Sequence, residues 1–185
     1  MATATLILPI AAATPADGTT GNEFPAISIV TSSDADNPKA RMFVAAFDDT
    51  TAETLSWSFR MPANYASGGT FKGQFYMAGA NTGTKYVAFA YCVQAVTPGD
   101  STAMTALDPA GSTGGGWYLP ASVTVSNTAG YLTALNSNSP NADSAVAGDS
   151  VIVMLQRVPT STNPVDDAVG DCMLVGDIHF EYTTT

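Results

Sequence analysis

The residues that could carry acid–base or nucleophilic chemistry are few. The chain contains one histidine, His179, and a hydrolase of the Ser/His/Asp or Cys/His type needs a histidine beside its nucleophile. Apolar residues alternate with polar ones around His179, so we expect its side chain to lie on the outward face of a strand. The sequence therefore predicts no catalytic residue and no enzymatic activity.

Metal and cofactor sites find little support in the residue spacing. Cys92 and Cys172 are far apart in the chain, and with a single histidine they lack the spacing of zinc ligands. The Gly114–Gly116 run lacks the Lys-Ser/Thr that completes a phosphate-binding loop. We expect no cofactor, and whether the two cysteines pair stays open.

Acidic residues cluster in three predicted turns. Calcium needs six to eight converging oxygens, whereas Asp also closes turns through its own backbone. Thirteen Asp against three Glu favour the turn interpretation. We expect no metal, with a calcium site as the alternative. The clusters are Asp34/Asp36, Asp48/Asp49 and Asp166/Asp167 with Asp171.

Three larger side chains invite a role in binding or in the core. Trp117 and Tyr118 follow three glycines, a pattern that suits a sugar-stacking platform or a partner contact; the alternative is that Trp117 closes one end of the core. Trp57 has the inward parity of its strand and is expected in the core. Arg157 ends an inward row, so we expect it to be buried beside a carboxylate.

Composition indicates a mostly β protein. The 185 residues include only three each of Glu, Lys, Gln and Arg, against 61 Val, Ile, Thr, Tyr, Phe and Trp. The net charge is −10, with six scattered basic residues, which argues against nucleic acid and anionic membrane surfaces as partners. The scarcity of cysteine fits synthesis in a reducing cytoplasm.

Period-two alternation predicts about eight strands, in a jelly-roll or Greek-key β-sandwich. The clearest segments are 54–61, 71–77 and 87–93, which we expect to form a meander, with a hairpin at Asn81–Gly83. Further strands are expected near 24–31, 42–48, 123–125, 131–135, 151–157 and 172–182. Residues 23–185 are thus predicted to be one domain of all-β class.

The first 22 residues are predicted to be an extended arm. They are rich in Ala and Thr, and Pro9, Pro15, Gly18 and Gly21 interrupt regular structure. We expect ordered strands to begin only near Phe24. The apolar residues of this arm, with the loop aromatics, are the predicted partner-binding set: Leu6, Ile7, Leu8, Ile10, Trp117 and Tyr118.

Strand-and-turn signatures over residues 43–182 resemble the jelly-roll virion proteins of tailed phages. They include the segments 55–62 (LSWSFRMP), 65–69 (YASGG), 96–100 (VTPGD), 148–151 (GDSV) and 180–182 (FEY). The resemblance implies a capsid cement or decoration protein, a homotrimer on the outer surface of the virion, made in the bacterial cytoplasm, with the major capsid protein as partner. The alternative is a receptor- or carbohydrate-binding domain of a tail fibre or spike.

Overall fold

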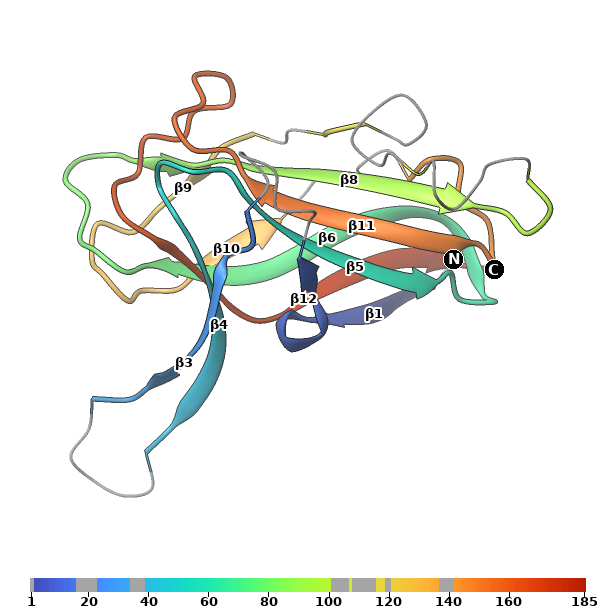
Figure 1. The fold of residues 1–185 in the computed structure, drawn as a ribbon, viewed down its shortest axis with the longest axis horizontal. Helices are drawn as coiled ribbons and strands as arrows, with labels where there is room; N and C mark the ends of the chain where they lie inside the picture. The colour runs from blue at the N-terminus through green and yellow to red at the C-terminus, as the bar shows by residue number, and fades with distance from the viewer. Residues whose placement is uncertain are drawn as a thin grey trace.

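The computed structural model describes residues 2–15, 23–33, 39–100, 107, 116–118, 121–136 and 142–185. These residues form antiparallel strands and one short 3-10 helix, Ile10–Ala12. Figure 1 shows an elongated body from which one hairpin projects, with the two ends of the chain close together. In the described part of the chain, no helix is long and apolar enough to cross a membrane.

The larger sheet has six strands. Its order is β10-β6-β12-β4-β3, and β1 also pairs with β12. The strands are β1 (Thr3–Pro9), β3 (Ala26–Thr31), β4 (Arg41–Phe47), β6 (Tyr65–Met77), β10 (Thr133–Asn136) and β12 (Cys172–Thr184). The central strand β12 pairs with β6 along most of its length, and its other edge pairs first with β4 and then with β1.

The second sheet has four strands, in the order β2-β5-β11-β8. They are β2 (Thr14–Pro15), β5 (Glu53–Arg60), β8 (Phe89–Val96) and β11 (Ser150–Arg157). A separate two-stranded pair joins β7 (Tyr86–Val87) to β9 (Val123–Thr124). Leu55 and Trp57 of β5 and Val151, Val153 and Leu155 of β11 are buried, as their alternation predicts.

Aromatic rings join the two sheets across the core. Phe71 of β6 stacks on Tyr91 of β8 with ring centroids 5.2 Å apart. Phe89 of β8 contacts Phe47 of β4 at 5.6 Å and Phe75 of β6 at 5.8 Å. Such contacts between the inner faces of two sheets define a β-sandwich. The expected all-β sandwich is confirmed, and eight of its strands are at least six residues long.

The order of the strands differs from the expected meander. β5 and β6 are consecutive but belong to different sheets, and β11 lies between β5 and β8. The meander was therefore wrong, and so was the hairpin at Asn81–Gly83. The last two long strands of the chain, β11 and β12, instead enter the middle of the two sheets. Alternation shows which face of a strand is buried, but it carries no information about the neighbouring strand.

The expected N-terminal arm is also wrong for residues 3–9. They form β1, paired with β12 from Thr3 opposite Thr183 to Pro9 opposite Asp177. The physical reason is a segment of Thr, Leu and Ile with period-two burial that covers an open edge of β12. Pro9 ends the strand, where its missing N–H breaks no ladder. Residues 16–22 of the predicted arm lie outside the described residues.

Candidate binding surfaces

The N-terminal residues of the predicted partner-binding set are mostly part of the core. Leu8 and Ile10 are 3% and 1% exposed, and Leu6 is half-buried against the core cluster. Ile7 points to the other face of β1 and is 53% exposed. Burial in the folded chain removes Leu8 and Ile10 from any docking surface.

Trp117 and Tyr118 lie beside the edge of β8. The Tyr118 N–H donates to the Tyr91 carbonyl at 2.7 Å, and the Tyr91 N–H donates to the Tyr118 carbonyl at 2.9 Å. Both aromatic residues are half-buried. The structure thus places the two residues together as an extension of the second sheet. Their exposure is intermediate between the two alternatives that the sequence leaves open, an exposed binding platform and a buried end of the core.

Arg157 is a structural residue, as the sequence predicts. It is fully buried, and its Nε and Nη2 donate to the two Asp166 carboxylate oxygens at 3.1 and 3.0 Å. Its remaining N–H groups donate to the carbonyls of Phe47, Ala168 and Gly170. Burial opposes the charge, but the Asp166 hydrogen bond and charge outweigh it and raise the pKa of Arg157. These hydrogen bonds connect Arg157 of β11 to the last residue of β4 and to the 166–170 loop.

Asp48 forms a turn, as expected, whereas Asp166 and Asp167 accept hydrogen bonds from residues distant in the chain. Asp48 Oδ1 accepts hydrogen bonds from the hydroxyl and N–H of Thr50 and from the Thr51 N–H, and these bonds lower the pKa of Asp48. Asp167 accepts from the Tyr86 N–H and from Lys85. Residues 34 and 36 lie outside the described residues. Within those described, no three His, Cys, Asp or Glu side chains gather as a metal site.

The remaining candidates for chemistry are separated or buried. Cys92 and Cys172 are both buried in the core, and burial raises the pKa of Cys172 far above its ordinary value. His179 is exposed on the outward face of β12, as expected. A buried neutral thiol is a poor nucleophile. The structure therefore does not bring His179 together with either cysteine.

The clearest exposed apolar surface lies on the hairpin of β3 and β4, which the sequence analysis did not single out. Ile29, Met42 and Phe43 are 51%, 44% and 50% exposed. Ile29 is the register partner of Phe43, and Val30 is the register partner of Met42. The two pairs occupy opposite faces of the hairpin, because successive residues of a strand point to opposite sides. We call Ile29, Met42 and Phe43 the hairpin surface.

The hairpin surface projects because the sheet narrows there. β12 pairs with β4 only at Val44–Phe47, so Arg41–Phe43 have β3 as their strand neighbour. Figure 1 shows β3 and β4 leaving the body at this point. The sequence contained a signal for this surface. Apolar residues at Ile27, Ile29 and Val30 and at 42–44 fall on both faces of their strands, whereas the half-buried strands of the body have one apolar face.

A polar groove lies on the outer face of the larger sheet. Ile7, His179, Lys72 and Asn136 are successive register partners across β1, β12, β6 and β10. The groove beside this row has a volume of about 450 Å³. Small residues and polar side chains both line it: Gly73, Ala134, Val175 and Gly176, with Lys72, Gln74, Asn136, Asp177 and His179. We call it the outer-face groove.

The outer-face groove owes its position to an irregularity in β12. The register with β6 shifts between Val175 and His179, and Gly176 lies there at φ +72°. This is also where the neighbour of β12 changes from β4 to β1. Asp177 and His179 are two residues apart in the strand and therefore point to the same face, where both line the groove. Gly176, a lone glycine inside the strand, is a residue type that often marks such a bulge.

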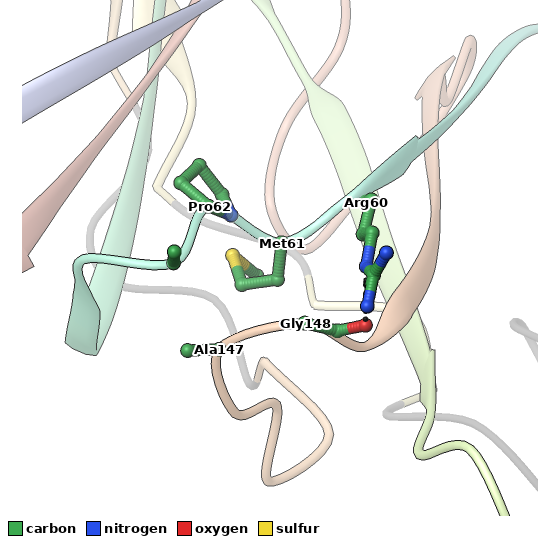
Figure 2. Close-up of a pocket in the computed structure, with 6 residues that line it drawn as sticks. Arg60, Met61, Pro62, Ala147 and Gly148 are labelled. Carbon is green, nitrogen blue, oxygen red and sulfur yellow. Dashed lines mark hydrogen bonds between the residues drawn. The ribbon is translucent and has the colours of Figure 1, made fainter.

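A second hollow lies where β5 ends (Figure 2). It has a volume of about 660 Å³ and is lined by Arg60, Met61, Pro62, Ala63, Ala147 and Gly148. Arg60 Nε donates to the Gly148 carbonyl at 3.0 Å. Arg60 supplies the single charged side chain of this lining. The hollow therefore offers no pair of groups for acid–base chemistry.

Comparison with known proteins finds similar solved structures but identifies no family. No family model matches the chain, and no curated protein matches it. Among solved structures, the chain is similar to TmCBM61, a carbohydrate-binding module in complex with β-1,4-galactotriose. The identity is 12% and the TM-score 0.38, over 88% of this chain and 92% of that one.

A second similar structure is the module CBM27-1 of Caldicellulosiruptor saccharolyticus in complex with mannohexaose. The identity is 12% and the TM-score 0.39, over 95% of this chain and 96% of that one. With TM-scores of this size, neither similarity carries an argument about the function of this chain. The candidate function therefore depends on the surfaces described above.

Proposed function

We propose that this chain is a non-enzymatic assembly protein of a phage particle, of the capsid cement or decoration type. The observation that carries the proposal is the hairpin surface, where three large apolar side chains are about half exposed on a projecting element. Burying such side chains against another protein is favourable by about 1–1.5 kcal/mol each at half exposure. A projecting apolar hairpin suits contact with protein subunits better than contact with a small polar ligand.

The resemblance to phage virion proteins supplies the rest of the proposal. On this resemblance we propose that the chain lies on the outer surface of the capsid, with the major capsid protein as partner. The low charge density of the chain, 12% charged residues, also suits packed protein contacts.

Co-sedimentation with empty capsids of the parent phage tests this function. The double variant Ile29→Ser/Phe43→Ser removes one apolar face of the hairpin surface, and we expect it to weaken capsid binding at least 10-fold. Ile7→Ser is the matched control, because Ile7 is equally exposed but lies in β1. Equal binding by the double variant and the wild type would contradict the proposal.

A second candidate function is carbohydrate binding, as in a receptor-binding domain of a tail fibre. The observation in its favour is the outer-face groove, where amide, carboxylate, ammonium and imidazole groups converge. Such groups can each bond sugar hydroxyls. Titration calorimetry with β-1,4-galactotriose and mannohexaose as first probes tests it. Binding that is lost in Gln74→Ala and Asn136→Ala but kept in Ile29→Ser/Phe43→Ser would establish this second function.

A further inference from the structure

We infer that the end of β5 around Arg60 binds an extended acidic peptide segment of a partner protein, with one carboxylate of the peptide on the Arg60 guanidinium. The Thr185 N–H donates to the Asn64 carbonyl at 3.1 Å, so this end of the body also holds the chain termini. Figure 1 shows it away from the hairpin of β3 and β4. The inference therefore goes beyond the proposed function and does not depend on the hairpin surface.

The first argument is that Arg60 is a cation without a carboxylate partner. The other basic residues of the body, Lys72, Lys85 and Arg157, each form an ion pair. Within the described residues Arg60 forms none, although the chain has 16 acidic and only six basic residues. Residues 54–99 contain no carboxylate at all. The exposed guanidinium is therefore available to a carboxylate from another molecule.

The guanidinium of Arg60 is also oriented by the fold. Its Nε donates to the Gly148 carbonyl at 3.0 Å (Figure 2). Gly148 is held in turn, because its N–H donates to the Met61 carbonyl at 3.0 Å. The next residue, Asp149, is buried, and its carboxylate accepts the Val146 N–H at 2.8 Å. The bond to Gly148 fixes the Nε of the guanidinium and leaves the two Nη groups for both oxygens of a carboxylate.

The second argument is that hollows flank Arg60 on two sides. One is the hollow of about 660 Å³ at the end of β5. The other has a volume of about 490 Å³, and its lining includes Ser58, Val96, Ser150 and Ile152 of the second sheet. Arg60 belongs to both linings and is the single charged residue of each. Neutral walls around one cation suit a ligand with one negative charge between uncharged residues, whereas a polyanion is repelled by the net charge of −10.

The third argument is the open edge of β5. β2 pairs with β5 only at residues 55 and 56, so in the described part of the chain no strand pairs with this edge at Ser58 and Arg60. The Thr54 N–H donates to the Glu23 carbonyl at this edge, at 2.7 Å. Backbone groups alternate in direction along a strand, so those of Ser58 and Arg60 face the same edge as those of Thr54. An extended peptide can pair there as an added strand and place an acidic side chain beside Arg60.

Fluorescence anisotropy with two labelled, end-blocked peptides tests the inference. GSVSDSVSG carries one carboxylate, and GSVSNSVSG carries an amide of the same shape in its place. We expect the first to bind with a Kd of about 100 µM or lower, and the second about 10-fold or more weakly. Arg60→Gln should remove this difference, and Arg60→Lys should retain part of it, because Lys keeps the charge but lacks the planar fork. Arg41→Gln, at an exposed arginine of the hairpin, is the matched control and should bind as the wild type does.

Amide hydrogen exchange followed by NMR gives a readout that needs no substitution. With GSVSDSVSG bound, the amides of Ser58 and Arg60 should exchange several-fold more slowly, because they donate to the added strand. The amides of β3, the last strand of the larger sheet, should exchange at an unchanged rate. Unchanged exchange at Ser58 and Arg60 in the bound state would contradict pairing at the edge of β5.

The outcomes separate this inference from the proposed function. No binding of GSVSDSVSG up to about 2 mM, equal binding of the two peptides, or unchanged binding by Arg60→Gln overturns the inference. Displacement of the peptide by an equal concentration of sodium acetate also overturns it, since the site would then bind a carboxylate without its peptide. Ile29→Ser/Phe43→Ser should bind GSVSDSVSG as the wild type does. Peptide binding that depends on Arg60 supports the inference even where capsid binding fails and the proposed function is overturned.

Discussion

Two neighbouring apolar residues of strand β4 differ in their exposure to solvent. Val44 is fully buried between β3 and β12, whereas the preceding residue, Phe43, is half exposed. Both belong to a run of apolar residues in one strand, and both are paired with β3. The two side chains point to opposite faces of the strand, and β12 lies beside Val44 but no longer lies beside Phe43. Exposure here depends on the face of the strand and on the extent of its neighbour, and not on residue type.

This contrast separates the stabilising part of the molecule from the part proposed to bind. In the body, aromatic residues of the two sheets contact one another and Arg157 has a full set of partners. In the hairpin, the apolar side chains of Ile29, Met42 and Phe43 are about half exposed. Substitutions in the body should therefore change the free energy of unfolding, and substitutions in the hairpin should change the binding of a partner.

The largest effect is expected from removal of residues 1–12. This deletion takes away β1, the buried Leu8 and Ile10, and the Pro9 carbonyl that accepts the Trp57 indole N–H at 2.8 Å. Loss of two buried aliphatic residues alone costs about 4–8 kcal/mol, comparable to the whole stability of an ordinary domain. We expect the truncated chain to be largely unfolded by circular dichroism.

Two point variants test whether the loss of buried side chains is the cause of this unfolding. Leu8→Ala should lower the free energy of unfolding by about 2–4 kcal/mol, and Ile7→Ala by less than about 1 kcal/mol. Denaturant titration measures both. A truncated chain that melts like the wild type would mean that β1 is not part of the folded body.

Arg157 should give the next largest effect. Arg157→Met leaves the buried Asp166 carboxylate without its ion pair, and breaking a buried pair in this way costs about 3–5 kcal/mol. Lys85→Met is the matched control, because the Lys85–Asp167 pair is exposed to solvent and should contribute little to the free energy of unfolding. Similar losses in the two variants, measured by urea unfolding, would contradict the structural role of Arg157.

Much of the body could be predicted from the sequence. Alternation correctly placed Trp57, Val153 and Arg157 on inward faces, because one side of each strand packs on the core. The turn role of Asp48 also followed from residue type, since Asp bonds to its own backbone wherever it lies. These features are local, and a single sequence contains the information for them.

The rest depends on contacts between distant segments. The sequence analysis missed β1 because this strand forms by pairing with an edge of β12, at the other end of the chain. The outer-face groove needs a bulge at Gly176, and the hairpin surface needs β12 to separate from β4 after Val44. Two of the predicted binding residues are buried for the same reason: Leu8 and Ile10 look like a free apolar segment until the strand partner of β1 is known.

The smallest effect is expected from a comparison of Val44 and Phe43, which are neighbours in β4. Val44→Ser places a hydroxyl in the core and removes buried methyl groups, so the free energy of unfolding should fall by about 2–3 kcal/mol. Phe43→Ser changes a side chain that is already half in water, and we expect a change within about 0.5–1 kcal/mol. Denaturant titration of the two variants measures both changes. Equal losses would show that Phe43 packs within its own chain, and the hairpin would then be part of the body rather than a surface for a partner.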